Sequence, residues 1–377
     1  MIAQLDYQSL QQLWWLLCSV VGSLFLFLTF VQGGQTLLRQ VTTNEIEKSL
    51  VINSLGRKWE LTFTTLVLFG GALFASFPKF YATSFGGAYW VWISILFTFI
   101  LQAVSYEYRK KPRNLLGAGI YELFLFLNGS LGILLIGTAV GTFYTGSNFR
   151  LSGYNLVTWT HSLRGLEAAF SLFNVSLGLF LVFNARTLGA MYLVNNLDFN
   201  DTPGLESRLR SACGRSFFCS LPFLLFILGN LLLMKGYGII DDQGTIGLVT
   251  RKYLGNLLAN PWLAAMLVGG LLLLVIGVFK TTGTDSTAGI WFGGPGTVLL
   301  SLTLLLLPAY NKTAFYPSRA DLQSSLTIYN ASSSPYTLKV MTYVAIFIPF
   351  VLAYIAFVWW SMDRKKITVE EIADHSY

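Results

Sequence analysis

Two glutamates are the residues of this chain that are best placed to do chemistry. Glu60 begins the apolar stretch 60–77 and Glu122 lies inside the stretch 116–143, and both stretches are long enough to cross a membrane. An ionisable side chain at membrane depth is costly and therefore indicates function, and a carboxyl group in a low dielectric can take up and carry a proton. The positions predict a proton entry route from one side of the membrane, with both carboxyl groups in one shared polar pocket.

Each glutamate also has a purely structural interpretation. Glu60 would sit at a helix N-terminus, where the helix dipole and the nearby Arg57 and Lys58 favour a negative charge. Glu122 would be a buried acid that stays neutral or bonds a neighbouring helix. The residues alone leave these alternatives open.

The two histidines of the chain are too few and too peripheral to hold haem. Haem iron in a membrane subunit is usually held by His side chains that project from helices, whereas His161 falls in a loop and His375 among the last three residues. The sequence shows no cluster of His, Cys, Asp and Glu with metal-ligand spacing and no glycine-rich phosphate loop. It therefore predicts no metal site, no haem ligand and no complete catalytic site in this chain.

The elements that would position these residues are transmembrane helices. The chain is 377 residues long, 54% hydrophobic and only 11% charged, and its apolar residues gather into runs without the period-two alternation of a barrel strand. Backbone polar groups in lipid must be satisfied within the protein, so these runs must be helices. The sequence predicts an all-α integral membrane protein in which residues 1–377 form a single polytopic domain. Nine helices are expected, near 13–32, 60–77, 88–106, 116–143, 166–185, 216–234, 260–279, 289–309 and 338–360.

The basic residues indicate the orientation of these helices. Most of the 25 Lys and Arg residues fall on one side if the helices alternate in direction from an outer N-terminus, and cytoplasmic loops are the ones enriched in basic residues. The predicted topology has the N-terminus outside and the C-terminus inside, with a long inner loop at 195–215. Sidedness and contact with anionic lipid then explain the net charge of +7, and no nucleic-acid partner is expected.

Three stretches give the chain a resemblance to a known family. They are VINSLGRKWE (51–60) running into GGALFA and Pro78, QAVSYEYRKK (102–111), and the C-terminal SSLTIYNASSSPYTLKVMTYVAIFIPFVLAYIAFVWW (324–360). Together and in this order they resemble subunit II, the smaller of the two main subunits, of the cytochrome bd quinol oxidases. The resemblance implies two four-helix bundles plus a peripheral ninth helix.

The resemblance also implies a partner. In that family a larger subunit carries haem b and haem d together with the quinol site, and the complex oxidises quinol and reduces O2 to water at the bacterial cytoplasmic (inner) membrane. This chain would then be the haem-free subunit, which stabilises the haem-bearing subunit and contributes to cytoplasmic proton uptake. The resemblance leaves open small single-helix accessory subunits and a structural quinone or lipid, and it indicates no quinone-binding residue here.

The expected proton route is where this chain departs from the family. Glu60 follows Trp59 at the position where the family usually has an Asp on a proton path from the cytoplasm. However, 28–33 reads LTFVQG where the family commonly reads Asp-Gly-aromatic-Asp-x-Gly, and 61–65 reads LTFTT in place of Gly-Asn-(Gln or Glu)-Val-Trp. The route would run on Glu60 with water, recruit Glu122, or lie wholly in the larger subunit.

A secondary transporter of a small solute is the alternative function. Many spans, embedded glutamates and the glycine-rich stretch 116–143 would suit one. A transporter would be expected to show inverted repeats and helices broken near the midplane by Gly or Pro. The candidate for such a break is GGPG at 293–296.

Overall fold

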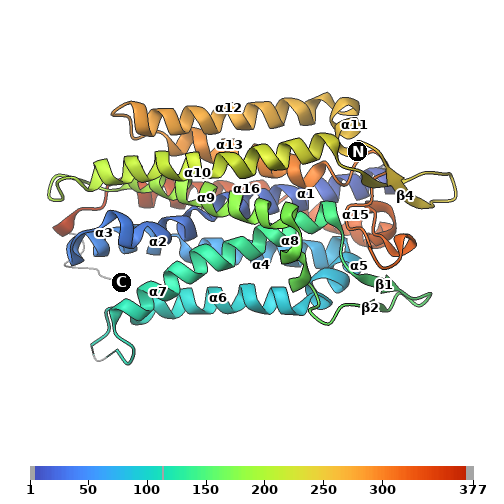
Figure 1. Cartoon of the computed structure of the whole chain (residues 1–377), viewed down its shortest axis with the longest axis horizontal. Coiled ribbons are helices and arrows are strands. Elements are labelled where there is room, and N and C mark those ends of the chain that lie inside the picture. Colours follow the sequence, from blue (N-terminus) through green and yellow to red (C-terminus); the bar gives the residue numbers. More distant parts are fainter. Residues whose placement is uncertain (1–4, 113, 371–377) are drawn as a thin grey trace.

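The computed structural model describes residues 5–112 and 114–370, which form an elongated bundle of helices running roughly along its long axis (Figure 1). One end of the bundle holds residues 109–111, 197–204 and 284–289, and is named here the charged end. The opposite end carries the β-strands and is named the hairpin end. The prediction of an all-α membrane protein is confirmed at the level of fold class.

Helices coincide with each of the nine predicted stretches. By length and composition, seven helical segments of the described chain could each cross a membrane, or eight if one bent pair counts as a single span. The number of spans and their sidedness therefore stay predictions. The helices are α1 (Tyr7–Leu28), α2 (Phe30–Val41), α3 (Glu45–Gly56), α4 (Trp59–Ser76), α5 (Pro78–Tyr81), η2 (Ala82–Gly86), α6 (Tyr89–Tyr108), α7 (Ala118–Leu127), η3 (Asn128–Gly132), α8 (Ile133–Thr145), η4 (Leu166–Phe170), α9 (Leu172–Asn196), α10 (Leu205–Leu233), α11 (Lys252–Ala259), α12 (Pro261–Gly283), α13 (Ile290–Leu306), η5 (Leu322–Ser324), α14 (Ile328–Ala331), α15 (Pro335–Ala345) and α16 (Ile348–Asp363).

Helix α9 packs against α2, α8 and α10 and is longer than predicted. Its predicted end at residue 185 is wrong, because the polar residues beyond it are held by protein. Arg186 donates hydrogen bonds to α2, and Asn196 accepts one from Ser54 of α3 at 2.7 Å. Helix α10 also begins earlier than predicted, so the expected inner loop 195–215 shrinks to 197–204.

Glycines let α9 lie very close to its neighbours. A Cβ added at Gly137 of α8 would collide with the backbone of Gly178, and one added at Gly33 of α2 would overlap the backbone of Ala185. Small residues of this kind let two helix backbones approach within a membrane. The glycine-rich stretch 116–143 therefore serves packing within the chain.

The GGPG segment, the candidate break for a transporter, does not interrupt its helix. Helix α13 runs unbroken through Pro295 of the GGPG segment. The bend is instead between α15 and α16, whose axes differ by 42°, directly before Pro349. Proline lacks an N–H and disfavours helical backbone in the residue before it. The feature that favoured a transporter is therefore not formed in the described α13.

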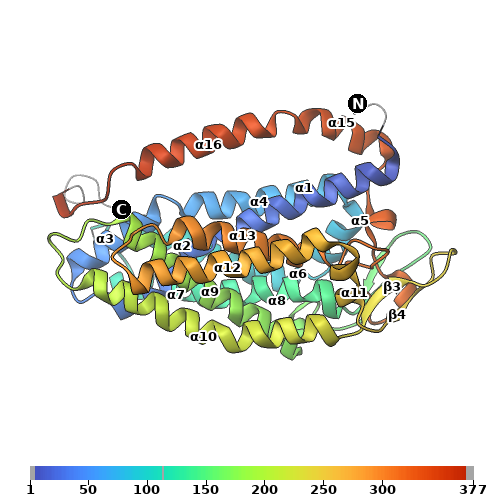
Figure 2. The ribbon, with the colours of Figure 1, turned by 90° about the horizontal axis from the view of Figure 1, so that it is seen from above.

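Helix α16 stands apart from the other helices. Seen from above, it arches away from α1 and α4 (Figure 2). None of its residues is buried within the described chain. Its charged end is nevertheless anchored, because Asp363 pairs with the buried Lys58 at 3.0 Å. The expected division of the remaining helices into two four-helix bundles stays a prediction.

Two short antiparallel hairpins cap the hairpin end. Strand β1 (Phe149–Leu151) pairs with β2 (Val157–Trp159), with Phe149 opposite Trp159. Strand β3 (Gly236–Ile239) pairs with β4 (Ile246–Val249), with Gly236 opposite Val249. Both hairpins lie in connections between helices, so they leave the helical class unchanged.

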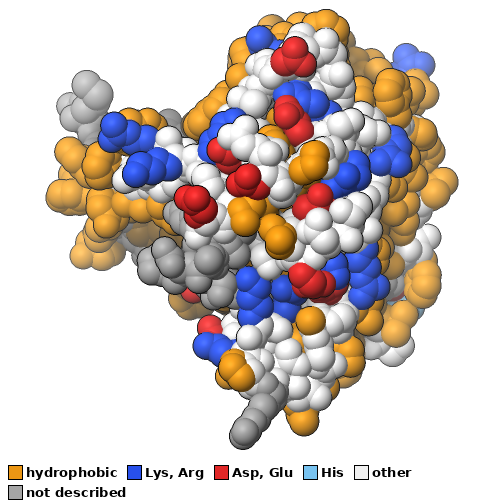
Figure 3. Space-filling view, turned by 90° about the vertical axis from the view of Figure 1, so that its left-hand side faces the viewer, with side chains coloured by type: hydrophobic (Ala, Val, Ile, Leu, Met, Phe, Trp, Pro, Cys, Tyr) orange, Lys and Arg blue, Asp and Glu red, His pale blue; other side chains and the backbone are white. Residues whose placement is uncertain are grey.

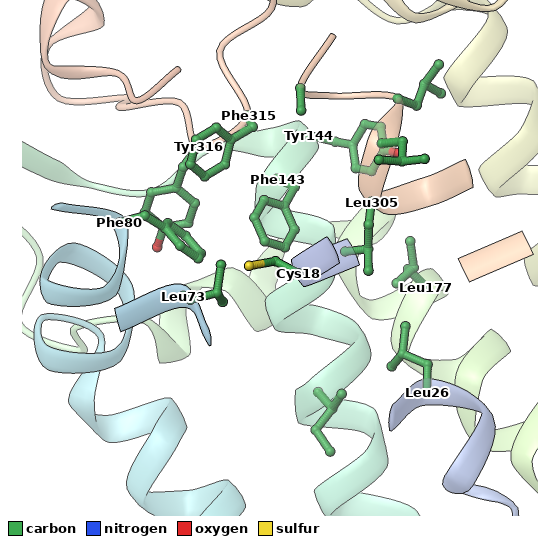
Figure 4. Close-up of a cluster of buried hydrophobic side chains, with 14 of the residues drawn as sticks. Cys18, Leu26, Leu73, Phe80, Phe143, Tyr144, Leu177, Leu305, Phe315 and Tyr316 are labelled. Carbon is green, nitrogen blue, oxygen red and sulfur yellow. The ribbon is translucent and has the colours of Figure 1, made fainter. Parts of the chain in front are cut away.

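The core beneath this end is aromatic. Phe80 of α5 and Phe143 of α8 have ring centroids 5.5 Å apart, and both pack against Phe315 and Tyr316 from the segment after α13 (Figure 4). Trp15 of α1 closes the cluster, 4.2 Å from the ring of Phe315. Segments far apart in the sequence thus meet in one tightly packed apolar region.

Candidate functional site

The charged end concentrates ionisable side chains that are mostly absent from the sides of the bundle. Figure 3 looks onto this end and shows Lys and Arg mixed with Asp and Glu, while hydrophobic side chains cover the periphery. Several of the charged groups are paired between helices. Arg208 of α10 donates to the buried Glu47 of α3 at 2.6 Å, and Arg210 of α10 donates to the Thr281 carbonyl of α12 at 2.6 Å. Charge at this end therefore connects helices as well as facing water.

Glu122 belongs to a network of four charged side chains. Its Oε1 accepts from the Arg109 guanidinium at 2.7 and 3.2 Å, and its Oε2 lies 3.4 Å from the Lys48 ammonium. Glu45 completes the network, 2.8 Å from both Arg109 and Lys48. Glu122 and Arg109 are buried, while the Glu45 side chain is 69% exposed. The network thus joins α3, α6 and α7 and extends from water into the protein.

Local sequence signals bring these four groups together. Asn44 caps α3 by accepting a hydrogen bond from the Glu47 N–H, which begins the helix with Glu45 in its first turn. Arg109 follows directly after α6, and Asn114 ties the α6–α7 turn by donating to the Arg109 carbonyl and accepting from the Gly117 N–H. Gly117 adopts a φ of 79°, which a residue with a side chain disfavours.

Of the alternatives for Glu122, the geometry favours the one in which it bonds neighbouring helices. Its contact with Arg109 was not predicted, although the two residues are only 13 positions apart in the sequence. A basic residue ending one span and an acid early in the next is the signal that could have revealed the pair. Removing one partner of a buried ion pair leaves an uncompensated charge, which is strongly unfavourable.

Glu60 is placed very differently. It is the second residue of α4, it is exposed, and within the described chain its carboxylate makes no ion pair or hydrogen bond. Lys58, expected to support it, instead pairs with Asp363 and lies 5.1 Å from the centre of the Trp359 ring. The structure therefore does not bring Glu60 and Glu122 into the shared pocket that was expected.

A cavity of about 540 Å³ separates α16 from the bundle. Its walls are mainly apolar and aromatic, including Phe27, Trp291 and Trp360, and polar atoms of Tyr192 and Asp363 line it near the charged end. A mainly apolar cavity that also borders polar residues suits a lipid or isoprenoid tail with a polar head. Sequence reasoning missed this cavity, because it depends on α16 standing away from α1 and α13.

The described histidine is not placed as a haem ligand. His161 lies in the loop between β2 and η4, with a 42% exposed side chain, and its Nδ1 accepts a hydrogen bond from the Leu163 N–H. His375 lies outside the described residues. Over residues 5–112 and 114–370, no group of three or more His, Cys, Asp and Glu side chains could hold a metal ion.

Known proteins match this chain over nearly its whole length. The model of the family described as cytochrome bd terminal oxidase subunit II matches residues 10–362. Cytochrome bd-I ubiquinol oxidase subunit 2 of Escherichia coli (strain K12) is 28% identical, over 99% of either chain. Cytochrome bd ubiquinol oxidase subunit 2 of Bacillus subtilis (strain 168) is 24% identical, over 96% of this chain and 98% of the relative. A chain of the bd oxidase structure from Geobacillus thermodenitrificans has a similar fold, with a TM-score of 0.62 at 13% identity, covering 95% of this chain and 100% of that one.

Proposed function

The chain belongs to the family of subunit II of the cytochrome bd terminal oxidases, and on this premise we propose that it is the haem-free subunit that stabilises its partner and takes part in proton uptake. Membership makes it a component of a quinol oxidase, an oxidoreductase complex of the inner membrane, in which it works with partner subunit I. The complex holds haem. The match over residues 10–362 is the observation that carries the proposal.

The position of the described histidine supports the proposal that this subunit holds no haem. His161, the described histidine, lies in an exposed loop at the hairpin end, whereas haem in a helical membrane subunit needs axial ligands projecting inward from helices. Haem b and haem d would therefore be held by the partner. Electrons from quinol to O2 would pass through that subunit and not through this chain.

The surface for the partner is proposed on α4 and α16. A membrane helix without any buried residue, as α16 is here, needs other contacts to hold its position. The open face of α4 carries Val67 and Phe74 but also the exposed Glu60. A carboxylate facing lipid is costly, so this face is better covered by protein than by lipid. The haem-bearing subunit would cover it.

This placement gives Glu60 its proposed role. With the charged end on the cytoplasmic side, Glu60 would lie at the subunit boundary near that side, within reach of water and of the partner. A carboxyl group there can take a proton from the cytoplasm and pass it on. Glu122, held by Arg109 and Lys48, would contribute as part of the entry surface.

The cavity beside α16 is proposed to hold the tail of a structural quinone or lipid. Its aromatic lining and about 540 Å³ of space support an apolar chain as occupant. Single-helix accessory subunits stay a prediction from the resemblance. The transporter alternative loses the support of its candidate break at GGPG, because α13 is unbroken.

Purification from the native membrane tests the assignment. The tagged chain should bring down a larger subunit with b- and d-type haem absorption, and recovery of a solitary haem-free protein would overturn the assignment. Photo-crosslinkers at Val67 of α4 should reach that subunit. The same probe at Val268 of α12 is the matched control, because the two side chains are exposed to 56% and 55%.

Glu60→Gln in the intact complex tests the proton role. Turnover, measured as quinol-driven oxygen consumption, should fall while the haem spectrum stays the same. Glu107→Gln removes another exposed carboxylate at the charged end and should leave turnover unchanged. Equal turnover in both variants would favour a purely stabilising subunit.

A further inference from the structure

Helix α6 carries a stripe of buried polar side chains along one face. Thr98, Gln102 and Tyr106 are each four residues apart, and they are 3%, 0% and 2% exposed. Residues at this spacing lie above one another on a helix. One further turn leads to Arg109 of the charged network. The stripe therefore begins at the charged end and runs into the protein.

Each residue of the stripe faces a polar side chain from another helix. Tyr106 Oη accepts from Gln35 Nε2 at 2.8 Å, and Gln102 Oε1 accepts from Gln32 Nε2 at 3.3 Å. Thr98 Oγ1 is 3.4 Å from the donating Nδ2 of Asn128. Three polar pairs thus form a ladder between α6 on one side and α2 and η3 on the other, named here the polar ladder.

The polar ladder is incompletely hydrogen-bonded. Four of its buried side-chain atoms have no protein partner within the described residues: Gln32 Oε1, Gln35 Oε1, Gln102 Nε2 and Asn128 Oδ1. An unsatisfied buried polar atom costs about 1–3 kcal/mol. Such atoms in folded proteins are normally satisfied by internal water, which makes about three hydrogen bonds to buried polar groups. Four open atoms in one ladder therefore indicate a site for several waters.

The backbone around Asn128 is shaped to reach the polar ladder. Residues 128–132 form a π-helical turn, a feature that is rare and frequent at functional sites. A Cβ at Gly129 would overlap the Gln32 carbonyl, and one at Gly132 would overlap the Thr98 hydroxyl. The absence of side chains at these two glycines lets η3 lie directly against α2 and α6.

The polar ladder spans only part of the membrane. From Arg109 to Thr98 the rise of an α-helix gives about 16 Å, roughly half of the ~30 Å hydrocarbon core. Beyond Thr98 the next buried residue of α6 on this side is Ile95, which is fully buried among apolar side chains. The ladder therefore opens toward the charged network and ends in apolar packing.

We propose that the polar ladder holds a column of internal water that carries protons from the charged end to mid-depth. This rests on the proposed role in proton uptake and names its path. Each water would accept a proton from the side of Glu122 and pass one to the next water, and the water at Thr98 would pass its proton to the haem-bearing subunit, where O2 reduction consumes it. No side chain of the ladder changes its protonation state. Tyr106 stacks on Trp59 of α4 with ring centroids 5.8 Å apart, so the column would lie next to the helix that carries the proposed surface for the haem-bearing subunit.

The path differs from one that uses acids along the helices. Gln and Thr orient water without holding a charge, and the two carboxylates and two cations of the Glu122 network balance one another at its entrance. Glu45, being exposed, exchanges protons with bulk water. Water would thus take the place of the acids absent from 28–33.

A structure of the intact complex at a resolution that shows ordered water is the direct test. Water density is expected within hydrogen-bonding distance of Gln32 Oε1, Gln35 Oε1, Gln102 Nε2 and Asn128 Oδ1. A polar ladder without water in a complex that contains the haem-bearing partner would overturn this inference and leave the proposed function standing. Failure to recover any such partner would count against the proposed function itself.

The paired variant Gln32→Met with Gln102→Met tests conduction. It replaces the central pair by apolar side chains of similar size, so the complex should assemble with an unchanged haem spectrum but lose the central waters and much of its quinol-driven oxygen consumption. Asn184→Leu is the matched control, since Asn184 is equally buried but bonds Thr297 away from the polar ladder. Full turnover in the paired variant would refute conduction, and if this variant fails to assemble, Asn128→Leu makes the same test at the inner end.

Discussion

The two halves of the bundle differ in how their buried polar side chains are hydrogen-bonded. In the hairpin half, Trp15 and Tyr144 pack among aromatic rings, and each donates its single polar hydrogen to a backbone carbonyl of α13, at 3.0 and 2.6 Å. In the charged half, buried polar side chains face each other in pairs and leave atoms open. The two buried donors of this aromatic cluster are therefore satisfied by backbone carbonyls, whereas four buried atoms of the polar ladder are left open.

This difference assigns a role to each half. A dry aromatic layer is a barrier to ions, because a charge in it would be neither solvated nor paired. The polar ladder, whose buried polar atoms lack protein partners, can take up water only from the charged end, because apolar packing closes its other end. The charged half would thus bring protons to mid-depth, where they pass to the haem-bearing subunit, and variants should respond differently in the two halves.

The largest effect is expected in the hairpin half. Phe315→Ala removes a ring that contacts four other aromatic residues, and it should lower the free energy of unfolding by about 4 kcal/mol through lost packing and a cavity. Thermal unfolding of the purified complex would measure this. Phe279→Ala on α12 is the control, since Phe279 is 64% exposed on a helix outside the proposed partner surface and should have little effect.

Breaking the charged network should come next. Arg109→Gln leaves Glu122 buried without its main partner and should cost about 3 kcal/mol of stability. Adding Glu122→Gln should recover part of this loss, because the unpaired carboxylate is then removed. Additive losses in the double variant, seen in the same unfolding assay, would show that the two side chains do not interact.

A smaller effect is expected in the polar ladder. Gln102→Met replaces a buried but under-bonded amide by an apolar side chain of similar size, so the change in unfolding free energy should stay under about 1.5 kcal/mol. A loss as large as that of Phe315→Ala would mean that the polar ladder is needed for packing. It would then resemble the hairpin half, and the contrast between the halves would fail.

The smallest structural effect is expected at Glu60. Its carboxylate makes no contact within the described chain, so Glu60→Gln should change the unfolding free energy by less than about 0.5 kcal/mol. A clear loss of stability in the intact complex would show instead that Glu60 pairs with the partner. In that case slowed turnover in this variant would reflect assembly and not proton transfer.

Sequence alone predicted the fold class and where the helices lie, but not which face of each helix is buried. Runs of apolar residues predicted where helices lie, because lipid requires them. The same reasoning misplaced the end of α9, since Arg186 is held by α2 and not by a membrane surface. It did not predict that Glu60 is exposed, and it left open whether Glu122 bonds a neighbouring helix, because which side of a helix is covered depends on its neighbours. The spacing of Thr98, Gln102 and Tyr106 was visible in the sequence, but the open atoms were not.

The most direct test of the account is proton uptake by the complex in sealed vesicles. Quinol-driven membrane potential and oxygen consumption should be followed together in the wild type and in the Gln32→Met, Gln102→Met variant. We expect both rates to fall together in the variant while the haem spectrum remains that of the wild type. Unchanged potential and turnover would contradict the claim that the charged half of this subunit brings protons to the reaction.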